Sequence, residues 1–398
     1  MKRFAQASYV MYFLAGLVIT TIGSVLPQIL RHYEVTYTMG GQLVFWGSIG
    51  FLVGVPVATL LLNRFSEKQI LALACLIIAG SQFMMWSLPP FSALLAINFM
   101  NCLGTAAVET IVATLMMEVF VRRRAVVMSY LEVSFGLGAL LMPVISSLLI
   151  SMDLWRYSFV VTGVMALAMT GVWVVITYSK TDLDENAAQD ASNMAPPENI
   201  SARLKWLLLV FFGFMIFMYC GIEGSMNNFL SSIFISYLDA APFLAALSVG
   251  LFWGAMVLGR LATGWIIRKV TYSRFLFISM ASSLIVLAAF IVLHNIWTGY
   301  ILIIALGLLL SGVYSITMVY ANHTFPGLAR LVTSLITGLA GLGGAVFPAL
   351  IGFVMDQAGS SWALWMTVGF AVFYLLSLAV VEAVYKKTGG SGNPAQAS

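Results

Sequence analysis

Charged residues are scarce in this sequence. Asp, Glu, Lys and Arg make up only 9% of its 398 residues, 61% are hydrophobic, and the mean hydropathy is +0.99. A soluble domain carries about 25% charged residues, so this composition cannot cover a surface in water. It excludes a soluble protein, a disordered chain and a nucleic-acid-binding protein. What remains is a polytopic membrane protein embedded in a lipid bilayer.

The sequence also lacks the residue patterns of most reactive and metal-binding sites. Its three cysteines, Cys75, Cys102 and Cys220, lie in apolar runs without CxxC spacing, which indicates neither a disulfide framework nor a metal site. It contains no Walker motif, no metal-ligand cluster, and no nucleophile with a base in helical register. We therefore predict a protein that is not an enzyme and that uses no cofactor and no metal.

Twelve apolar runs are long enough to cross a membrane, because a spanning helix needs about 20 mostly apolar residues. The alternation of apolar and polar residues that marks transmembrane strands is missing. We predict an all-α fold with twelve transmembrane helices. The runs cover residues 9–30, 43–63, 70–88, 92–120, 125–150 and 155–178 in the first half, and 205–236, 244–267, 274–294, 296–321, 328–354 and 362–385 in the second.

The basic residues follow the loops on one side of the predicted membrane. Sixteen of the 19 Lys and Arg residues fall on the side of the two termini, Arg31 and Arg156 fall on the other side, and Arg260 lies within a span. Cytoplasmic loops carry such an excess of Lys and Arg. We predict an integral plasma-membrane protein, in a bacterial inner membrane, with both termini in the cytoplasm.

The chain divides into two halves of six spans each. The longest hydrophilic segment, 179–204, lies between them, and each half carries Phe-Trp-Gly in its second span, at 45–47 and 252–254. Repeated units of this kind build transporters with a site between the halves. We predict two pseudo-symmetric six-helix bundles, 1–178 and 205–385. We interpret 179–204 as a cytoplasmic linker and 386–398 as a flexible cytoplasmic tail.

Three carboxylates lie well inside predicted spans, away from the span ends, where ionisable groups are costly and usually functional. Glu109 is near the middle of its span, which suits a group that binds and releases a proton; the alternative is a permanently protonated, hydrogen-bonded core residue. Glu132 suits either proton coupling or a counter-charge to the arginines at 122–124. We predict Glu109 and Glu132 as proton-coupling residues.

Polar residues share helical faces with two of these carboxylates. Asn98 and Thr105 lie on the face of Glu109 by helical spacing. Polar residues lie one helical turn before and one turn after Glu223, at Tyr219 and Asn227. The two glycines in 221–228 favour a broken helix there. We predict that these faces bind the polar groups of a substrate. The predicted substrate-binding residues are Asn98, Thr105, Tyr219, Glu223, Asn227, Asn228 and Trp253.

Arg260 is the cation that lies well inside a span, with Trp253 on the same helical face seven residues earlier. It suits three roles: holding an anionic substrate, pairing with a carboxylate, or gating near the cytoplasmic surface. The ring of Trp253 suits stacking against a sugar, although most aromatic residues in such proteins serve packing or interfacial anchoring.

Twelve spans in two halves with an acidic central loop resemble the major facilitator superfamily. Of that family's G-x-x-x-D-R-x-G-R-K pattern after the second span only Arg64 remains, whereas 259–264 (GRLATG) keeps a recognisable form after the eighth. The resemblance implies that Arg64 and Arg260 belong to an intracellular gate.

Within the superfamily, the chain is similar to the fucose:proton symporters. The similar segments are 104–110 (GTAAVET), 221–230, 250–264 (GLFWGAMVLGRLATG) and 341–352 (GLGGAVFPALIG). The likeness implies that Glu109 is a substrate- or proton-binding carboxylate. The chain departs from that group in its first span, which carries no acidic residue.

The main hypothesis is a secondary active transporter that works by alternating access as a monomer. It carries a sugar or another small polar solute in symport with protons, with sodium as the other possible ion. One alternative is proton-coupled efflux of drugs or hydrophobic metabolites, because 22 methionines and 27 phenylalanines suit an adaptable pocket. Another is a membrane sensor that keeps the fold but transports nothing.

Overall fold

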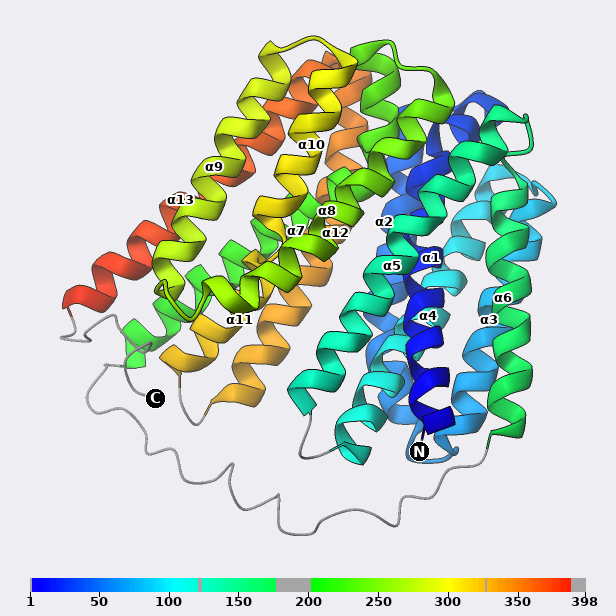
Figure 1. Cartoon of the computed structure of the whole chain (residues 1–398), viewed down its shortest axis with the longest axis horizontal. Coiled ribbons are helices and arrows are strands. Elements are labelled where there is room, and N and C mark those ends of the chain that lie inside the picture. Colours follow the sequence, from blue (N-terminus) through cyan, green and yellow to red (C-terminus); the bar gives the residue numbers. More distant parts are fainter. Residues whose placement is uncertain (1, 121–123, 177–201, 326–327, 388–398) are drawn as a thin grey trace.

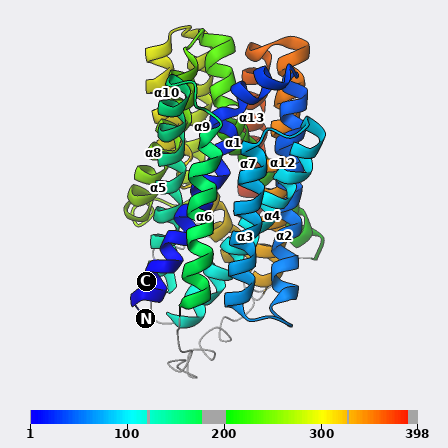
Figure 2. The same ribbon diagram turned by 90° about the vertical axis from the view of Figure 1, so that its right-hand side faces the viewer.

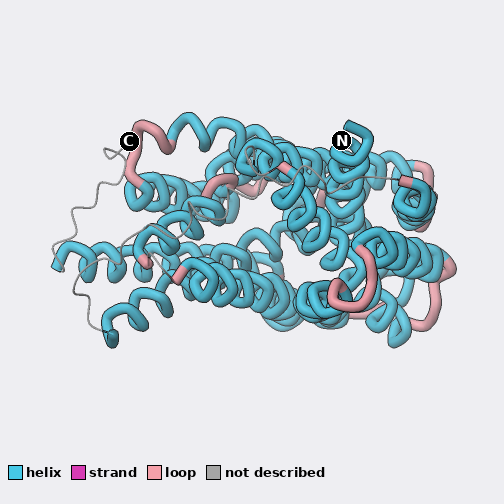
Figure 3. Tube along the Cα trace, turned by 90° about the horizontal axis from the view of Figure 1, so that it is seen from below, coloured by secondary structure: helices cyan, strands magenta, loops and turns pink. Residues whose placement is uncertain are grey.

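The computed structural model describes residues 2–120, 124–176, 202–325 and 328–387. These residues form helices and loops without any strand, as Figure 3 shows from below. The helices are α1 (Lys2–Tyr33), α2 (Tyr37–Leu61), α3 (Glu67–Trp86), α4 (Phe91–Val119), α5 (Arg124–Ser151), α6 (Tyr157–Val175), α7 (Ala202–Leu238), α8 (Pro242–Ile266), α9 (Tyr272–Val292), α10 (Ile296–Leu310), α11 (Val313–Thr324), α12 (Ala329–Ala358) and α13 (Ser360–Lys387).

The twelve predicted spans are confirmed, with α10 and α11 together forming one of them. The first span begins several residues earlier than its hydropathy predicts. The reason is that this end of α1 packs against protein: Phe4 and Ser8 are buried, and the ring of Phe4 meets that of Trp173 on α6 edge-on at 6.1 Å. A window of hydropathy does not register such a contact.

The break predicted in the seventh span is wrong, because α7 is continuous from Ala202 to Leu238. The glycines there serve close packing. A Cβ atom at Gly221 would come within 2.2 Å of the ring of Phe347 on α12, and one at Gly224 within 3.3 Å of the Cα of Gly344. The interrupted span is instead the tenth, where α10 ends at Leu310 and α11 begins at Val313.

The helices form two bundles, α1–α6 and α7–α13, which diverge toward the end of the molecule where the chain termini lie (Figure 1). We call the end at which α1 begins and α13 ends the terminal end, and the opposite one the far end. Within the first bundle α3 packs against α6, and both lie toward the viewer in Figure 2. Across the bundles, α2 packs against α12, α5 against α8, and α1 against α7.

The two bundles share a hydrophobic core only in part of their length. One buried cluster joins the second bundle to first-bundle residues near the far end, among them Leu30, Met85 and Leu94. A separate cluster belongs to the first bundle alone and includes Phe4, Ile70 and Trp173, toward the terminal end. The bundles are therefore packed together at the far end.

A carboxylate also links the two bundles by hydrogen bonds at the far end. Asp356, near the end of α12, accepts hydrogen bonds from the backbone amides of Tyr37 and Thr38 at 3.0 and 2.6 Å and from the hydroxyl of Thr38. These amides begin α2, whose N-cap residue Thr36 makes no side-chain cap. Asp356 thus caps a helix of the other bundle. Most of the predicted linker and tail lies outside the described residues, so the predicted bundle boundaries stay predictions.

Candidate functional site

The most distinctive polar group of the structure is an arginine placed between two carboxylates from different bundles. Nη1 of Arg260 on α8 lies 3.1 Å from Oε2 of Glu132 on α5, and its Nη2 lies 3.9 Å from Oε1 of Glu223 on α7. The three side chains keep 25%, 50% and 20% of their surface accessible, so the space beside them is not filled by other side chains. We call these three residues the ion triplet.

Close packing of α5 on α8 places the ion triplet. Gly136 on α5 leaves room for Val257 on α8, since a Cβ atom at Gly136 would come within 2.2 Å of a methyl carbon of that valine. Gly250 and Gly254 on α8 lie against Leu140 on α5 in the same way. With the two helices so close, the long side chain of Arg260 reaches across the bundle boundary.

Trp253 lies on the same face of α8 as Arg260, seven residues earlier in the helix. Its indole Nε1 donates a hydrogen bond to Oδ1 of Asn227 on α7 at 2.8 Å, and Nδ2 of Asn227 donates to the carbonyl oxygen of Ile19 on α1 at 3.3 Å. The guanidinium of Arg260 lies 5.9 Å from the centre of the Trp253 ring, and the ring of Phe135 on α5 lies 5.8 Å from it. Asn227 is therefore held by protein groups and orients the indole.

Glu109 on α4 lies in the first bundle near these groups. Its Oε1 atom is buried and has no hydrogen-bond partner among the described residues. The hydroxyl of Tyr12 on α1 donates to its backbone carbonyl at 3.0 Å. Glu132 lies near enough that the two carboxylates would repel each other if both were ionised. A buried carboxyl oxygen without a partner is unusual in a protein interior.

Two further predicted residues, Asn228 and Tyr219, lie on α7. Asn228 on α7 is partly exposed, and its Nδ2 donates to the carbonyl of Gly224 at 2.8 Å. Tyr219, one turn before Glu223, is fully buried and donates to the carbonyl of Leu310 at 3.2 Å, at the point where α10 ends. Tyr219 thus contacts the interruption between α10 and α11.

Asn98 and Thr105 are not brought together with this group. Both are buried in the contact between α4 and its neighbours: Nδ2 of Asn98 donates to the carbonyl of Leu43 on α2 at 2.9 Å, and the hydroxyl of Thr105 donates to the carbonyl of Asn101. Gly47 on α2 leaves the room that the amide of Asn98 occupies. Helical spacing predicted that both lie on the face of Glu109, but Asn98 packs against α2 and Thr105 is buried with its hydroxyl bound within α4.

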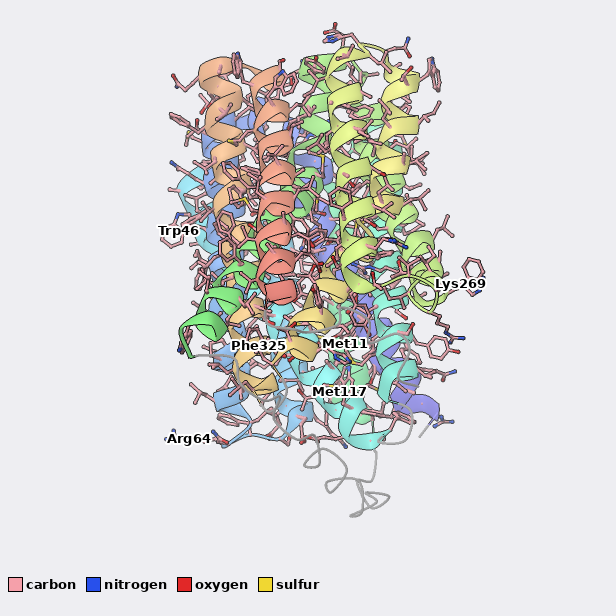
Figure 4. All side chains as sticks on the ribbon, turned by 90° about the vertical axis from the view of Figure 1, so that its left-hand side faces the viewer. Met11, Trp46, Arg64, Met117, Lys269 and Phe325 are labelled. Carbon is pink, nitrogen blue, oxygen red and sulfur yellow. The ribbon has the colours of Figure 1, made fainter. Side chains whose placement is uncertain are left out.

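Arg64 lies apart from the other predicted residues. It is exposed in the turn between α2 and α3 at the terminal end and points to the edge of the molecule in Figure 4. Its predicted gating role stays a prediction. The described residues contain no group of three or more His, Cys, Asp or Glu side chains that could hold a metal ion.

Sequence reasoning missed three residues that the structure places beside Glu109 or at the bundle boundary. Tyr12 and Phe135 carry no pattern in the sequence that separates them from packing aromatics. Asp356 lies near the end of a span, where an acidic residue is ordinary. Its partner gave no signal either, because Thr36 is a residue type that commonly caps a helix, and only the structure shows that it makes no side-chain cap.

Comparison with known proteins decides the family. The model of the Major Facilitator Superfamily matches residues 8–294 and 221–397. The chain belongs to the Major Facilitator Superfamily. The superfamily that the sequence resembles is thereby confirmed, and the chain is a membrane transporter and not an enzyme.

Relatives and solved structures agree with this assignment. The glucose/mannose transporter GlcP of Bacillus subtilis (strain 168) is 28% identical over 352 residues, which are 88% of this chain and 87% of the relative. Two structures share the fold at low identity. One is a bacterial homologue of the human lysosomal transporter Spinster, inward-facing and occupied, with a TM-score of 0.77, 13% identity, and coverage of 96% of this chain and 97% of that chain. The other is the partially occluded, inward-open xylose transporter XylE from E. coli, with a TM-score of 0.75, 12% identity, and coverage of 95% and 97%.

Proposed function

We propose that this superfamily member is a secondary active transporter that takes a hexose into the cell together with protons by alternating access. The observation that carries the proposal is the ion triplet, which joins both bundles beside the oriented ring of Trp253. The similarity to a glucose/mannose transporter supports the substrate class. The excess of basic residues at the terminal end supports placing that end in the cytoplasm.

The groups around the ion triplet suit a neutral, hydroxyl-rich ring. An indole face packs against the C–H face of a sugar, and the edge of the sugar then presents hydroxyls to polar side chains. Glu223 on α7 and Arg260 on α8 offer an acceptor and donors beside Trp253. We therefore propose that the sugar binds between α7, α8 and α5.

Proton coupling is proposed for Glu109, with Glu132 as its partner. The unpartnered oxygen of Glu109 is a place for a proton, and protonation removes the repulsion between Glu109 and Glu132. Glu132 is at the same time held by Arg260 of the other bundle. A change of charge at Glu109 therefore alters the electrostatic environment of the Glu132–Arg260 contact. The two bundles must make and break this contact during alternating access.

The test uses the purified chain in proteoliposomes that contain a trapped pH dye. Adding glucose or mannose outside is expected to acidify the lumen, with no dependence on sodium. Glu109→Gln is expected to abolish uphill accumulation and proton movement while sugar counterflow persists, because exchange needs no net proton transfer.

Glu34→Gln is the matched control, because Glu34 is exposed at the far end of α1, outside the proposed site. It is expected to leave both activities unchanged. Silence across a panel of sugars in folded protein would contradict the substrate class. Unchanged uphill accumulation in Glu109→Gln would contradict the role of Glu109.

A further inference from the structure

A groove of about 620 Å³ lies at the terminal end of the second bundle, apart from the ion triplet. It is formed by the beginning of α9 and the last turns of α13. The lining residues that matter here are Ser273, Arg274 and Phe277 on α9, and Ala379, Glu382 and Ala383 on α13.

The groove presents one cation and one anion that do not pair with each other. Arg274 is exposed, and no ion pair within 4 Å joins it to Glu382 in the described structure. Glu382 is held in place, because its Oε1 accepts a hydrogen bond from the hydroxyl of Tyr320 on α11 at 2.8 Å. A ligand that fits both charges therefore carries a negative and a positive group of its own.

The rest of the lining is apolar and belongs to membrane-spanning segments. Phe277 is 57% exposed, and Ala379 and Ala383 are exposed beside it. The spans that contain these residues are Tyr272–Val292 and Ser360–Val384, so Arg274 and Glu382 lie where both spans end. The groove thus has an apolar side at the depth of acyl chains and a charged side at the depth of lipid head groups.

We propose that this groove binds phosphatidylethanolamine, with the phosphate at Arg274 and the primary ammonium at Glu382. An arginine fork matches the geometry of a phosphate, and a carboxylate accepts the N–H groups of an ammonium. The hydroxyl of Ser273 adds a donor on the phosphate side. The acyl chains lie along Phe277 and Ala379.

Other phospholipids are complementary to only part of the lining of this groove. Phosphatidylglycerol supplies a phosphate for Arg274 but offers no cation to Glu382. Phosphatidylcholine carries a cation without N–H groups, so it cannot donate a hydrogen bond to Glu382. A soluble zwitterion such as glycerophosphoethanolamine has no chains for the apolar side. The proposal does not depend on the transported substrate.

The experiment is native mass spectrometry of the full-length protein, purified in detergent and exposed to an equimolar mixture of the three lipids with identical acyl chains. Phosphatidylethanolamine is expected to be retained several-fold more than either other lipid. Millimolar glycerophosphoethanolamine is expected not to displace it, and displacement would overturn the role of the acyl chains.

Two variants separate the parts of the proposed site. Arg274→Gln is expected to lower the retention of both phosphatidylethanolamine and phosphatidylcholine several-fold, because it removes the phosphate ligand. Glu382→Gln is expected to abolish the preference between these two lipids while retaining binding, because only the ammonium contact is lost. A role of Glu382 in folding alone would not change this preference.

Arg268→Gln is the matched control, because Arg268 is exposed in the same loop region, carries the same charge and does not line the groove. It is expected to retain the lipids as the unmodified chain does. Each variant is first checked for an unchanged elution volume and unfolding temperature. Equal retention of all three lipids, a preference for phosphatidylglycerol, or unchanged selectivity in Glu382→Gln would overturn the proposal.

Discussion

At the scale of single residues, Arg260 is the one side chain among the described residues that contacts carboxylates of both bundles. Its contact with Glu132 is short and its contact with Glu223 is longer. The triplet therefore carries one cation against two potential anions, and removing the cation leaves Glu132 and Glu223 facing each other without compensation. An uncompensated charge is more costly than a missing pair.

Arg260→Gln is expected to lower sugar counterflow by about tenfold, which corresponds to about 1.4 kcal/mol. The double variant Arg260→Gln/Glu132→Gln is expected to recover part of this loss, because it removes the orphaned charge together with its partner. Initial rates of counterflow in proteoliposomes measure both. Strictly additive losses in the double variant would contradict the pairing.

Trp253 tests the sugar site without changing any charge. Trp253→Phe keeps an aromatic face but loses the hydrogen bond to Asn227, so a several-fold rise in the KM for sugar is expected; Trp253→Ala loses the face as well and is expected to raise KM further. Trp46→Phe is the control, since Trp46 occupies the matching position of the repeat but is 46% exposed and points outward (Figure 4). Equal effects at both tryptophans would contradict the site.

At the scale of elements, the contact between α2 and α12 joins the bundles at the far end. Asp356 supplies the cap that Thr36 does not give to α2. Gly352 on α12 lets the backbone at Tyr37 approach closely, because a Cβ atom there would lie 2.3 Å from the carbonyl oxygen of Tyr37. This contact must open whenever the far end opens.

Asp356→Ala is expected to shift the protein toward states that are open at the far end, because the loss of a helix cap costs about 0.5–2 kcal/mol. Spin labels on Glu34→Cys and Asp239→Cys, both exposed at the far end of different bundles, report the change as longer distances in pulsed electron paramagnetic resonance. The native cysteines are replaced in this background.

Asp356→Asn provides the graded control, because it keeps one acceptor oxygen for the amides of α2. It is expected to lengthen the distances less than Asp356→Ala does. Identical distance distributions in the unmodified protein and in both variants would show that Asp356 does not hold the bundles together.

The elements also show how far the sequence predicts the structure. Hydropathy gave all twelve spans, because the bilayer demands long apolar helices wherever they lie. The glycine pattern placed the helix break in the seventh span instead of the tenth, because glycines such as Gly221 and Gly224 indicate close packing as well as breaks. The sequence singles out Glu132, Glu223 and Arg260 one by one, because each is costly in a membrane. Their pairing depends on how α5, α7 and α8 cross, which the sequence does not show.

At the scale of the whole molecule, the two bundles adopt one arrangement of the alternating-access cycle. They share a buried core near the far end, whereas the first bundle has a core of its own toward the terminal end. With the terminal end proposed as cytoplasmic, this is the inward-open arrangement. The sugar is then expected to reach Trp253 from the cytoplasm alone.

A reversible link across the far end tests this arrangement. The hydroxyl of Thr38 hydrogen-bonds the carboxylate of Asp356, so Thr38→Cys/Asp356→Cys brings two thiols close enough for a short cross-linker. Linking is expected to abolish counterflow, because the far end no longer opens, and cleavage of the linker is expected to restore it. Sugar binding by the linked protein in detergent, followed by quenching of tryptophan fluorescence, is expected to persist because the terminal end stays open.

The combination of lost counterflow and retained binding distinguishes a locked transporter from a misfolded one. Thr38→Cys alone, treated in the same way, controls for modification of the thiol. If the linked protein transports at the full rate, the bundles do not separate at α2 and α12 during the cycle. If it neither binds nor transports while its unfolding temperature is unchanged, the sugar reaches its site from the far end, which contradicts an arrangement that is open at the terminal end.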